Sequence, residues 1–175
     1  MELTNIGVIK SLFEQHGFSF TKSLGQNFLI NPAVCPRIAE MGGAKPGVCA
    51  LEIGTGVGVL TKELAERCDK VIAVEIDTSL KPILDETLAE YDNVEIVFAD
   101  VMETDLAALL AEKAAGMEVV VCANLPYYIT SPVIMRVLES RLPVKSMTVM
   151  VQKEAADRHR GLRRNILRGF VLQRA

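Results

Sequence analysis

Short apolar runs alternate with amphipathic segments along most of this chain. The apolar runs predict five buried strands, over residues 48–53, 70–76, 94–98, 119–123 and 146–151. Apolar residues at helical spacing predict helices over residues 6–16, 31–41, 60–67, 80–91, 106–115 and 132–140. Buried strands joined by crossover helices indicate a parallel sheet, so we expect an α/β, doubly wound, Rossmann-like fold.

The polar residues with chemical potential fall where the predicted strands end. They are the turn Glu52-Ile-Gly-Thr-Gly-Val-Gly58, the acids Glu75 and Asp100, and the segment Asn124-Leu-Pro-Tyr127. Doubly wound sheets bind ligands at the carboxyl ends of their strands, near the point where the strand order reverses. The sequence therefore predicts that these residues share one site.

Two glycines, Gly54 and Gly56, lie two apart in the first of these turns. Glycine lets a ligand approach the backbone closely, because no side chain blocks it. The dinucleotide pattern G-x-G-x-x-G is absent, and the observed spacing is better suited to a nucleoside without phosphate. A glycine-rich turn without any ligand is the alternative interpretation.

Two acids complete a predicted nucleoside site. Glu75 is placed to accept hydrogen bonds from both hydroxyls of a ribose. Asp100 could accept one from the amino group of an adenine, with Ile76 and Val101 as apolar walls. An acid at a strand end is also a common helix cap, and this alternative stays open for Asp100.

The segment after the fourth predicted strand suggests an acceptor site for an amine. The exocyclic amine of adenine is a poor nucleophile, because its lone pair is delocalised into the ring. If the Asn124 side-chain carbonyl and the Leu125 backbone carbonyl accept its two N–H groups, the lone pair is directed at a sulfonium methyl. Pro126 fixes the turn, and Tyr127 offers a ring for an extruded base. A simple strand-ending turn with a core tyrosine is the alternative.

Five motifs, in this order and spacing, resemble the small-subunit ribosomal RNA adenine dimethyltransferases over about nine-tenths of the chain. They are Lys22-Ser-Leu-Gly-Gln-Asn-Phe-Leu29, Glu52-Ile-Gly-Thr-Gly56, Val74-Glu-Ile-Asp77, Asn124-Leu-Pro-Tyr-Tyr-Ile129 and Val151-Gln-Lys-Glu154. The resemblance implies S-adenosylmethionine as cofactor and the N6 amines of two adjacent adenosines in small-subunit ribosomal RNA as acceptors, methylated during subunit assembly. The related erythromycin-resistance enzymes, which modify large-subunit RNA, match less well.

The resemblance also implies roles for individual residues. Residues expected to contact the cofactor are Gln26, Asn27, Leu29, Gly54, Gly56, Glu75, Ile76, Asp100, Val101 and Asn124. Residues expected to handle the target base are Asn124, Leu125, Pro126 and Tyr127.

The chain departs from the family pattern in two places. Thr55 stands where the family usually has proline, a change that a glycine-flanked turn should tolerate. Beyond Arg158 the family continues into further strands and a small helical domain, which this sequence lacks. We therefore expect an incomplete catalytic domain over residues 1–157 and an arginine-rich tail over 158–175, the product of a frameshift or early termination. A sheet without its last strands should have an exposed edge and marginal stability.

Charge changes the expected mode of RNA binding. The tail holds six arginines and no acid, which leaves 13 basic and 22 acidic residues in 1–157, a net charge of −9. An RNA-binding surface must then be local. A non-catalytic RNA- or ribosome-binding fragment is the alternative function, although tail arginines are more often simply solvated. The glycine spacing disfavours a third candidate, a nicotinamide-dependent oxidoreductase.

Other sequence features narrow the class of protein. Four cysteines without C-x-x-C pairs or clustered histidines suggest buried thiols rather than a metal site or disulfides. The start lacks a basic-then-apolar leader, and the apolar runs are too short to cross a bilayer. We expect a cytoplasmic, monomeric protein.

Overall fold

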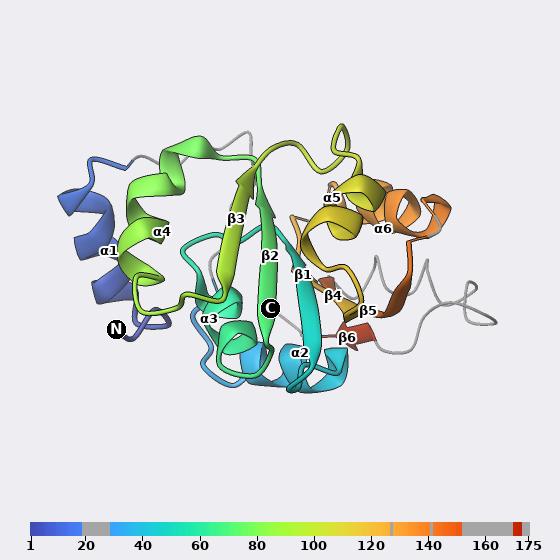
Figure 1. Cartoon of the computed structure of the whole chain (residues 1–175). Coiled ribbons are helices and arrows are strands. Elements are labelled where there is room, and N and C mark those ends of the chain that lie inside the picture. Colours follow the sequence, from blue (N-terminus) through green and yellow to red (C-terminus); the bar gives the residue numbers. More distant parts are fainter. Residues whose placement is uncertain (19–28, 127, 141, 152–169, 173–175) are drawn as a thin grey trace.

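A parallel sheet forms the centre of the protein in a computed structural model that describes residues 1–18, 29–126, 128–140, 142–151 and 170–172. The strand order is β3-β2-β1-β4-β5-β6, and every neighbouring pair is parallel (Figure 1). The strands are β1 (Val48–Ile53), β2 (Lys70–Glu75), β3 (Val94–Phe98), β4 (Glu118–Asn124), β5 (Val144–Val151) and β6 (Phe170–Leu172). The order reverses between β1 and β4, which opens a crevice at their carboxyl ends.

Helices connect the strands and cover both faces of the sheet. They are α1 (Ile6–Gln15), α2 (Val34–Gly42), α3 (Val59–Ala65), the 3₁₀ helix η2 (Thr78–Leu80), α4 (Lys81–Thr87), α5 (Leu106–Lys113) and α6 (Thr130–Glu139). Local signals set several helix ends. The Asn5 side chain accepts from the Gly7 N–H to begin α1, and the Asp105 side chain accepts from the Ala108 N–H to begin α5. Gly43, at φ 83°, ends α2.

Alternate residues of β1 enter two different cores. Leu51 and Ile53 pack with apolar residues of α5 and α6, whereas Val48 and Ala50 pack with those of α2 and α3. A third core joins α1 to α4, which lie together at the β3 end of the sheet (Figure 1). Strands buried on both faces explain why the sequence shows continuous apolar runs rather than alternation.

The five predicted strands and six predicted helices are all present, with ends that shift by up to about four residues. The largest shift is in α4, which ends at Thr87 rather than at residue 91. No helix in the described segments is long and apolar enough to span a bilayer.

Strand β6 is not among the predicted elements. It pairs with the end of β5, from Val149 opposite Phe170 to Val151 opposite Leu172. It therefore covers the last part of an edge that we expected to be open. Among the described residues, no strand pairs with this edge of β5 before Val149. The rest of the arginine-rich tail lies outside the described residues, so the division at residue 158 stays a prediction.

Candidate active site

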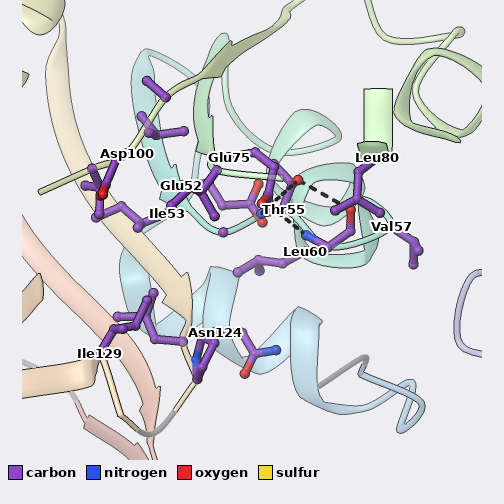
Figure 2. Close-up of a pocket in the computed structure, with 18 of the residues that line it drawn as sticks. Glu52, Ile53, Thr55, Val57, Leu60, Glu75, Leu80, Asp100, Asn124 and Ile129 are labelled. Atoms are coloured by element: carbon purple, nitrogen blue, oxygen red, sulfur yellow. Dashed lines mark hydrogen bonds between the residues drawn. The ribbon is translucent and has the colours of Figure 1, made fainter. Parts of the chain in front are cut away.

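A pocket of about 250 Å³ lies at the carboxyl ends of β1, β2, β3 and β4 (Figure 2). Its lining combines the glycine turn after β1 with the segments that follow the next strands. The described residues that line it are Leu29, Glu52, Ile53, Gly54, Thr55, Gly56, Val57, Val59, Leu60, Val74, Glu75, Ile76, Leu80, Ala99, Asp100, Val101, Met102, Asn124, Leu125, Pro126, Tyr128 and Ile129. Most of these side chains are apolar, so the few polar groups determine what the pocket can bind.

The glycine turn depends on backbone conformations that other residues rarely adopt. Gly54 and Gly56 have φ angles of 78° and 55°. The Gly54 N–H donates to the Val74 carbonyl at 2.9 Å, which holds the turn against β2. A Cβ added at Gly54 would lie 3.9 Å from the backbone carbonyl oxygen of Asn124, so the turn directly adjoins the end of β4. The predicted cofactor and acceptor regions are therefore neighbours.

Glu75, the predicted ribose acid, is buried at the end of β2 with hydrogen bonds to the glycine turn. Its Oε2 atom accepts from the Thr55 N–H at 2.8 Å, from the Thr55 hydroxyl at 2.9 Å and from the Gly56 N–H at 3.3 Å. Its Oε1 atom accepts from the Asp77 N–H at 2.9 Å. In this conformation Glu75 therefore joins β2 to the turn, and a ribose would have to share its oxygens with these donors.

Glu52 lines the pocket, and the sequence predicted its place in the shared site but no individual role for it. Its side chain is fully buried, and neither carboxyl oxygen has a hydrogen-bond partner among the described residues. Burial is the largest cause that raises the pKa of Glu52 from 4.5 to about 8. The nearby Thr61 hydroxyl opposes this shift of the pKa, and the negative charge of Glu75 adds to it. A glutamate within an otherwise apolar buried strand was the sequence signal for such a residue.

Asp100 follows β3 at the side of the pocket. Its Oδ1 atom accepts from the Met102 N–H at 2.8 Å, and its carbonyl accepts from the Thr104 hydroxyl at 2.7 Å. Asp100 thus stabilises the turn after β3 and also lines the pocket, whereas the helix cap that was its alternative role belongs to Asp105, which begins α5. Val101 is buried and Ile76 is half exposed, and both line the pocket beside it.

The segment after β4 forms a hydrogen-bonded turn that leads into α6. The Pro126 carbonyl accepts from the Ile129 N–H at 3.1 Å and from the Thr130 hydroxyl at 3.0 Å. Leu125 is buried in the core beneath α6, which anchors the turn. These contacts fix the backbone next to Asn124, so its position at the pocket is set by the fold.

The structure brings most of the predicted site residues together. Those that line the one pocket are Leu29, Gly54, Gly56, Glu75, Ile76, Asp100, Val101, Asn124, Leu125 and Pro126. Gln26, Asn27 and Tyr127 lie outside the described residues. Pocket residues that the sequence analysis gave no role include Glu52, Met102, Tyr128 and Ile129. Thr55 was noted only as a departure from the family pattern, yet it makes two hydrogen bonds with Glu75.

The described segments contain no group of three or more histidine, cysteine, aspartate or glutamate side chains that could hold a metal ion. All four cysteines are buried and free. The polar residues that line the pocket carry carboxylates, an amide and hydroxyls beside the backbone groups, a set suited to an organic ligand with hydroxyl and amino groups.

Comparison with known proteins gives consistent matches. The sequence model of the family described as ribosomal RNA adenine dimethylase matches residues 17–168. Ribosomal RNA small subunit methyltransferase A of Alkaliphilus oremlandii is 51% identical over 149 residues, which cover 85% of this chain and 52% of that protein. The protein of the same name from Geobacillus kaustophilus is 49% identical over 158 residues, or 90% of this chain and 54% of that protein. The chain thus spans about half the length of these relatives.

Solved structures support the same fold. The 23S rRNA methyltransferase ErmE superposes with a TM-score of 0.66 at 32% identity, over 78% of this chain and 52% of that one. A dimethyladenosine transferase from Plasmodium falciparum superposes with a TM-score of 0.61 at 31% identity, over 73% of this chain and 44% of that one. The expected α/β fold is therefore confirmed, by the sheet itself and by these structures.

Proposed function

This chain belongs to the ribosomal RNA adenine dimethylase family, and on that premise we propose that its pocket binds S-adenosylmethionine for methyl transfer to the N6 amines of adenosines in small-subunit ribosomal RNA. The observation that carries this proposal is the convergence of three polar residues. Glu75 ends β2, Asn124 ends β4 and Asp100 comes two residues after β3, and all three line one pocket beside the glycine turn. A carboxylate pair and an amide match the hydroxyl and amino groups of an adenosine and its acceptor amine.

The residues present fit the cofactor. When bound, S-adenosylmethionine supplies a methyl group on a positively charged sulfonium. Gly54 and Gly56 leave the backbone open to a ligand, Glu75 accepts from ribose hydroxyls, and Asp100 accepts from the adenine amine. Glu52 adds a buried carboxyl group without a hydrogen-bond partner among the described residues, and a cationic ligand would offset the cost of its ionisation.

The acceptor end of the pocket positions the amine. The Asn124 side-chain carbonyl and the Leu125 backbone carbonyl accept its two N–H groups, which directs the nitrogen lone pair toward the methyl carbon. The hydrogen bonds from Ile129 and Thr130 to the Pro126 carbonyl hold the backbone beside these two carbonyls. Tyr127 stacks on the extruded base, a contact worth about 1–3 kcal/mol.

The acceptors are two adjacent adenosines, each methylated during assembly of the small subunit in the cytoplasm, and the protein acts as a monomer. RNA contacts are local, because residues 1–157 carry a net charge of −9. In the alternative, a non-catalytic RNA-binding fragment, the arginines of 158–175 would contact phosphate.

One assay tests this function. The protein and methyl-labelled S-adenosylmethionine are mixed in two separate reactions. One reaction contains immature small subunits, and the other contains naked large-subunit RNA. Label in N6-methylated adenosines of the small subunit supports the proposal. Label in large-subunit RNA supports the alternative, a large-subunit RNA methyltransferase, for which the 32% identity to ErmE is the supporting observation. Subunit binding without transfer supports a non-catalytic RNA-binding fragment, and contradicts the proposal for this chain.

A further inference from the structure

One oxygen of the Glu75 carboxylate has more hydrogen-bond donors around it than it has lone-pair sites. Its Oε2 atom meets three donors, at 2.8 Å, 2.9 Å and 3.3 Å, of which two come from Thr55 and one from Gly56. A carboxylate oxygen offers about two lone-pair sites. A ligand hydroxyl that donates to this oxygen must therefore replace one of the three.

The Thr55 hydroxyl is the donor most easily replaced. The other two donors are backbone N–H groups, whose directions are set by the turn. The hydroxyl can rotate about its Cβ–Oγ bond, and it has a second acceptor, because the Gly56 carbonyl oxygen lies 3.4 Å from Thr55 Oγ1. Rotation toward Gly56 would keep the hydroxyl bonded and would leave its donor position at Glu75 Oε2 open to a ligand hydroxyl.

We propose that the Thr55 hydroxyl competes with the ribose hydroxyls of an adenosyl ligand for Glu75, and that Thr55 thereby sets the affinity of this pocket for its cofactor. This inference rests on the proposed function. In the empty pocket the hydroxyl donates to Glu75 and stabilises the turn. In the loaded pocket it donates to the Gly56 carbonyl, and a ribose hydroxyl takes its place. The exchange lowers affinity, because a bond to a charged acceptor is replaced by one to a neutral carbonyl.

The test removes the hydroxyl and keeps the shape of the side chain. Thr55→Val retains the backbone N–H that bonds Glu75, and Thr55→Ser retains a hydroxyl. The matched control is Thr87→Val, since Thr87 is a buried threonine in α4 that does not line the pocket and has no hydrogen-bond partner for its hydroxyl among the described residues. The probes are S-adenosylhomocysteine and its 2′,3′-dideoxy analogue, titrated calorimetrically into the full chain.

The competition predicts that Thr55→Val binds S-adenosylhomocysteine about 3- to 10-fold more tightly than the wild type, while its ligand-free melting temperature falls. These opposite directions distinguish competition from a purely structural role, which would lower both. Thr55→Ser and Thr87→Val should bind within about twofold of the wild type. The gain should disappear with the dideoxy analogue, which has no hydroxyl to take the vacated position.

Equal or weaker binding by Thr55→Val, with normal binding by the wild type, overturns the inference and leaves the proposed function standing. An equal gain with the dideoxy analogue overturns it as well. Thr55→Ala provides a second hydroxyl-free variant and must change affinity in the same direction. If the wild type binds no S-adenosylhomocysteine, the proposed function itself fails, and this inference fails with it.

Discussion

Glu52 and Glu75 line the same pocket from neighbouring parallel strands, but only Glu75 has hydrogen-bond donors around its carboxylate among the described residues (Figure 2). Glu75 is satisfied by backbone and hydroxyl donors of the glycine turn. Glu52 is fully buried, and it is largely protonated at neutral pH because its pKa is raised to about 8. The protonation state of Glu52 therefore follows from its surroundings.

Replacement of Glu52 by glutamine should remove a pH dependence of stability. The pKa of Glu52 is 4.5 in the ordinary case and about 8 in the folded protein. Its stabilising contribution is complete below pH 4.5 and is lost as pH rises toward 8, because the unfolded chain ionises first. Near pH 8 the free energy of unfolding of Glu52→Gln should exceed that of the wild type by up to a few kcal/mol. This upper bound follows from the raised pKa, because each pKa unit corresponds to about 1.4 kcal/mol.

Urea unfolding of both proteins between pH 4.5 and 8.5 measures this difference. Glu103→Gln is the control, because Glu103 is an exposed acid outside the pocket. If the free energies of unfolding of the wild type and of Glu52→Gln change with pH in parallel, Glu52 is not buried in the way that the structure shows.

The native protein should be nearly inert to thiol reagents at pH 8. Burial raises the pKa of Cys35 to about 12, that of Cys49 to about 11 and that of Cys122 to about 12, and it also raises the pKa of Cys68. The thiolate, which is the reactive form, is then scarce. Titration with Ellman's reagent should show four thiols only after unfolding in urea. Fast reaction of any thiol in the native protein would contradict the packing of α2 and α3 against the sheet.

Asn124→Ala should separate methyl transfer from cofactor binding. Loss of the side-chain carbonyl removes an acceptor for the target amine, so transfer should fall by at least about 100-fold. The affinity for S-adenosylhomocysteine should fall much less than transfer, since Glu75 and Asp100 are retained. Asn5→Ala is the control, because Asn5 is exposed and caps α1 far along the chain from the pocket segments. Transfer that survives in Asn124→Ala would assign the activation of the amine to another residue.

The elements of this fold were predictable because their signals are local. Strand β1 is found over the predicted residues 48–53, since both of its faces are buried and its apolar run is continuous. Strand β6 was not predictable, because three residues in an arginine-rich segment carry no periodic pattern, and its only described pairing is with distant β5.

The location of the site was also predictable, but the state of its groups was not. The predicted strand ends placed Glu75 and Asp100 together at the carboxyl ends of the parallel strands. The donors to the Oε2 atom of Glu75 come from Thr55 and Gly56, about 20 positions away, and depend on the conformation of the turn. The burial of Glu52 likewise arises from helices packed over its strand, which no motif describes.

Calorimetric titration with S-adenosylhomocysteine tests the central claim most directly, because it asks whether the strand ends hold one adenosyl ligand. We expect a single site, weakened at least about fivefold by Asp100→Ala and by Glu75→Gln, and unaffected by Asp105→Ala, which removes only the cap of α5. Absence of binding, or equal binding by the wild type and both pocket variants, would contradict the account.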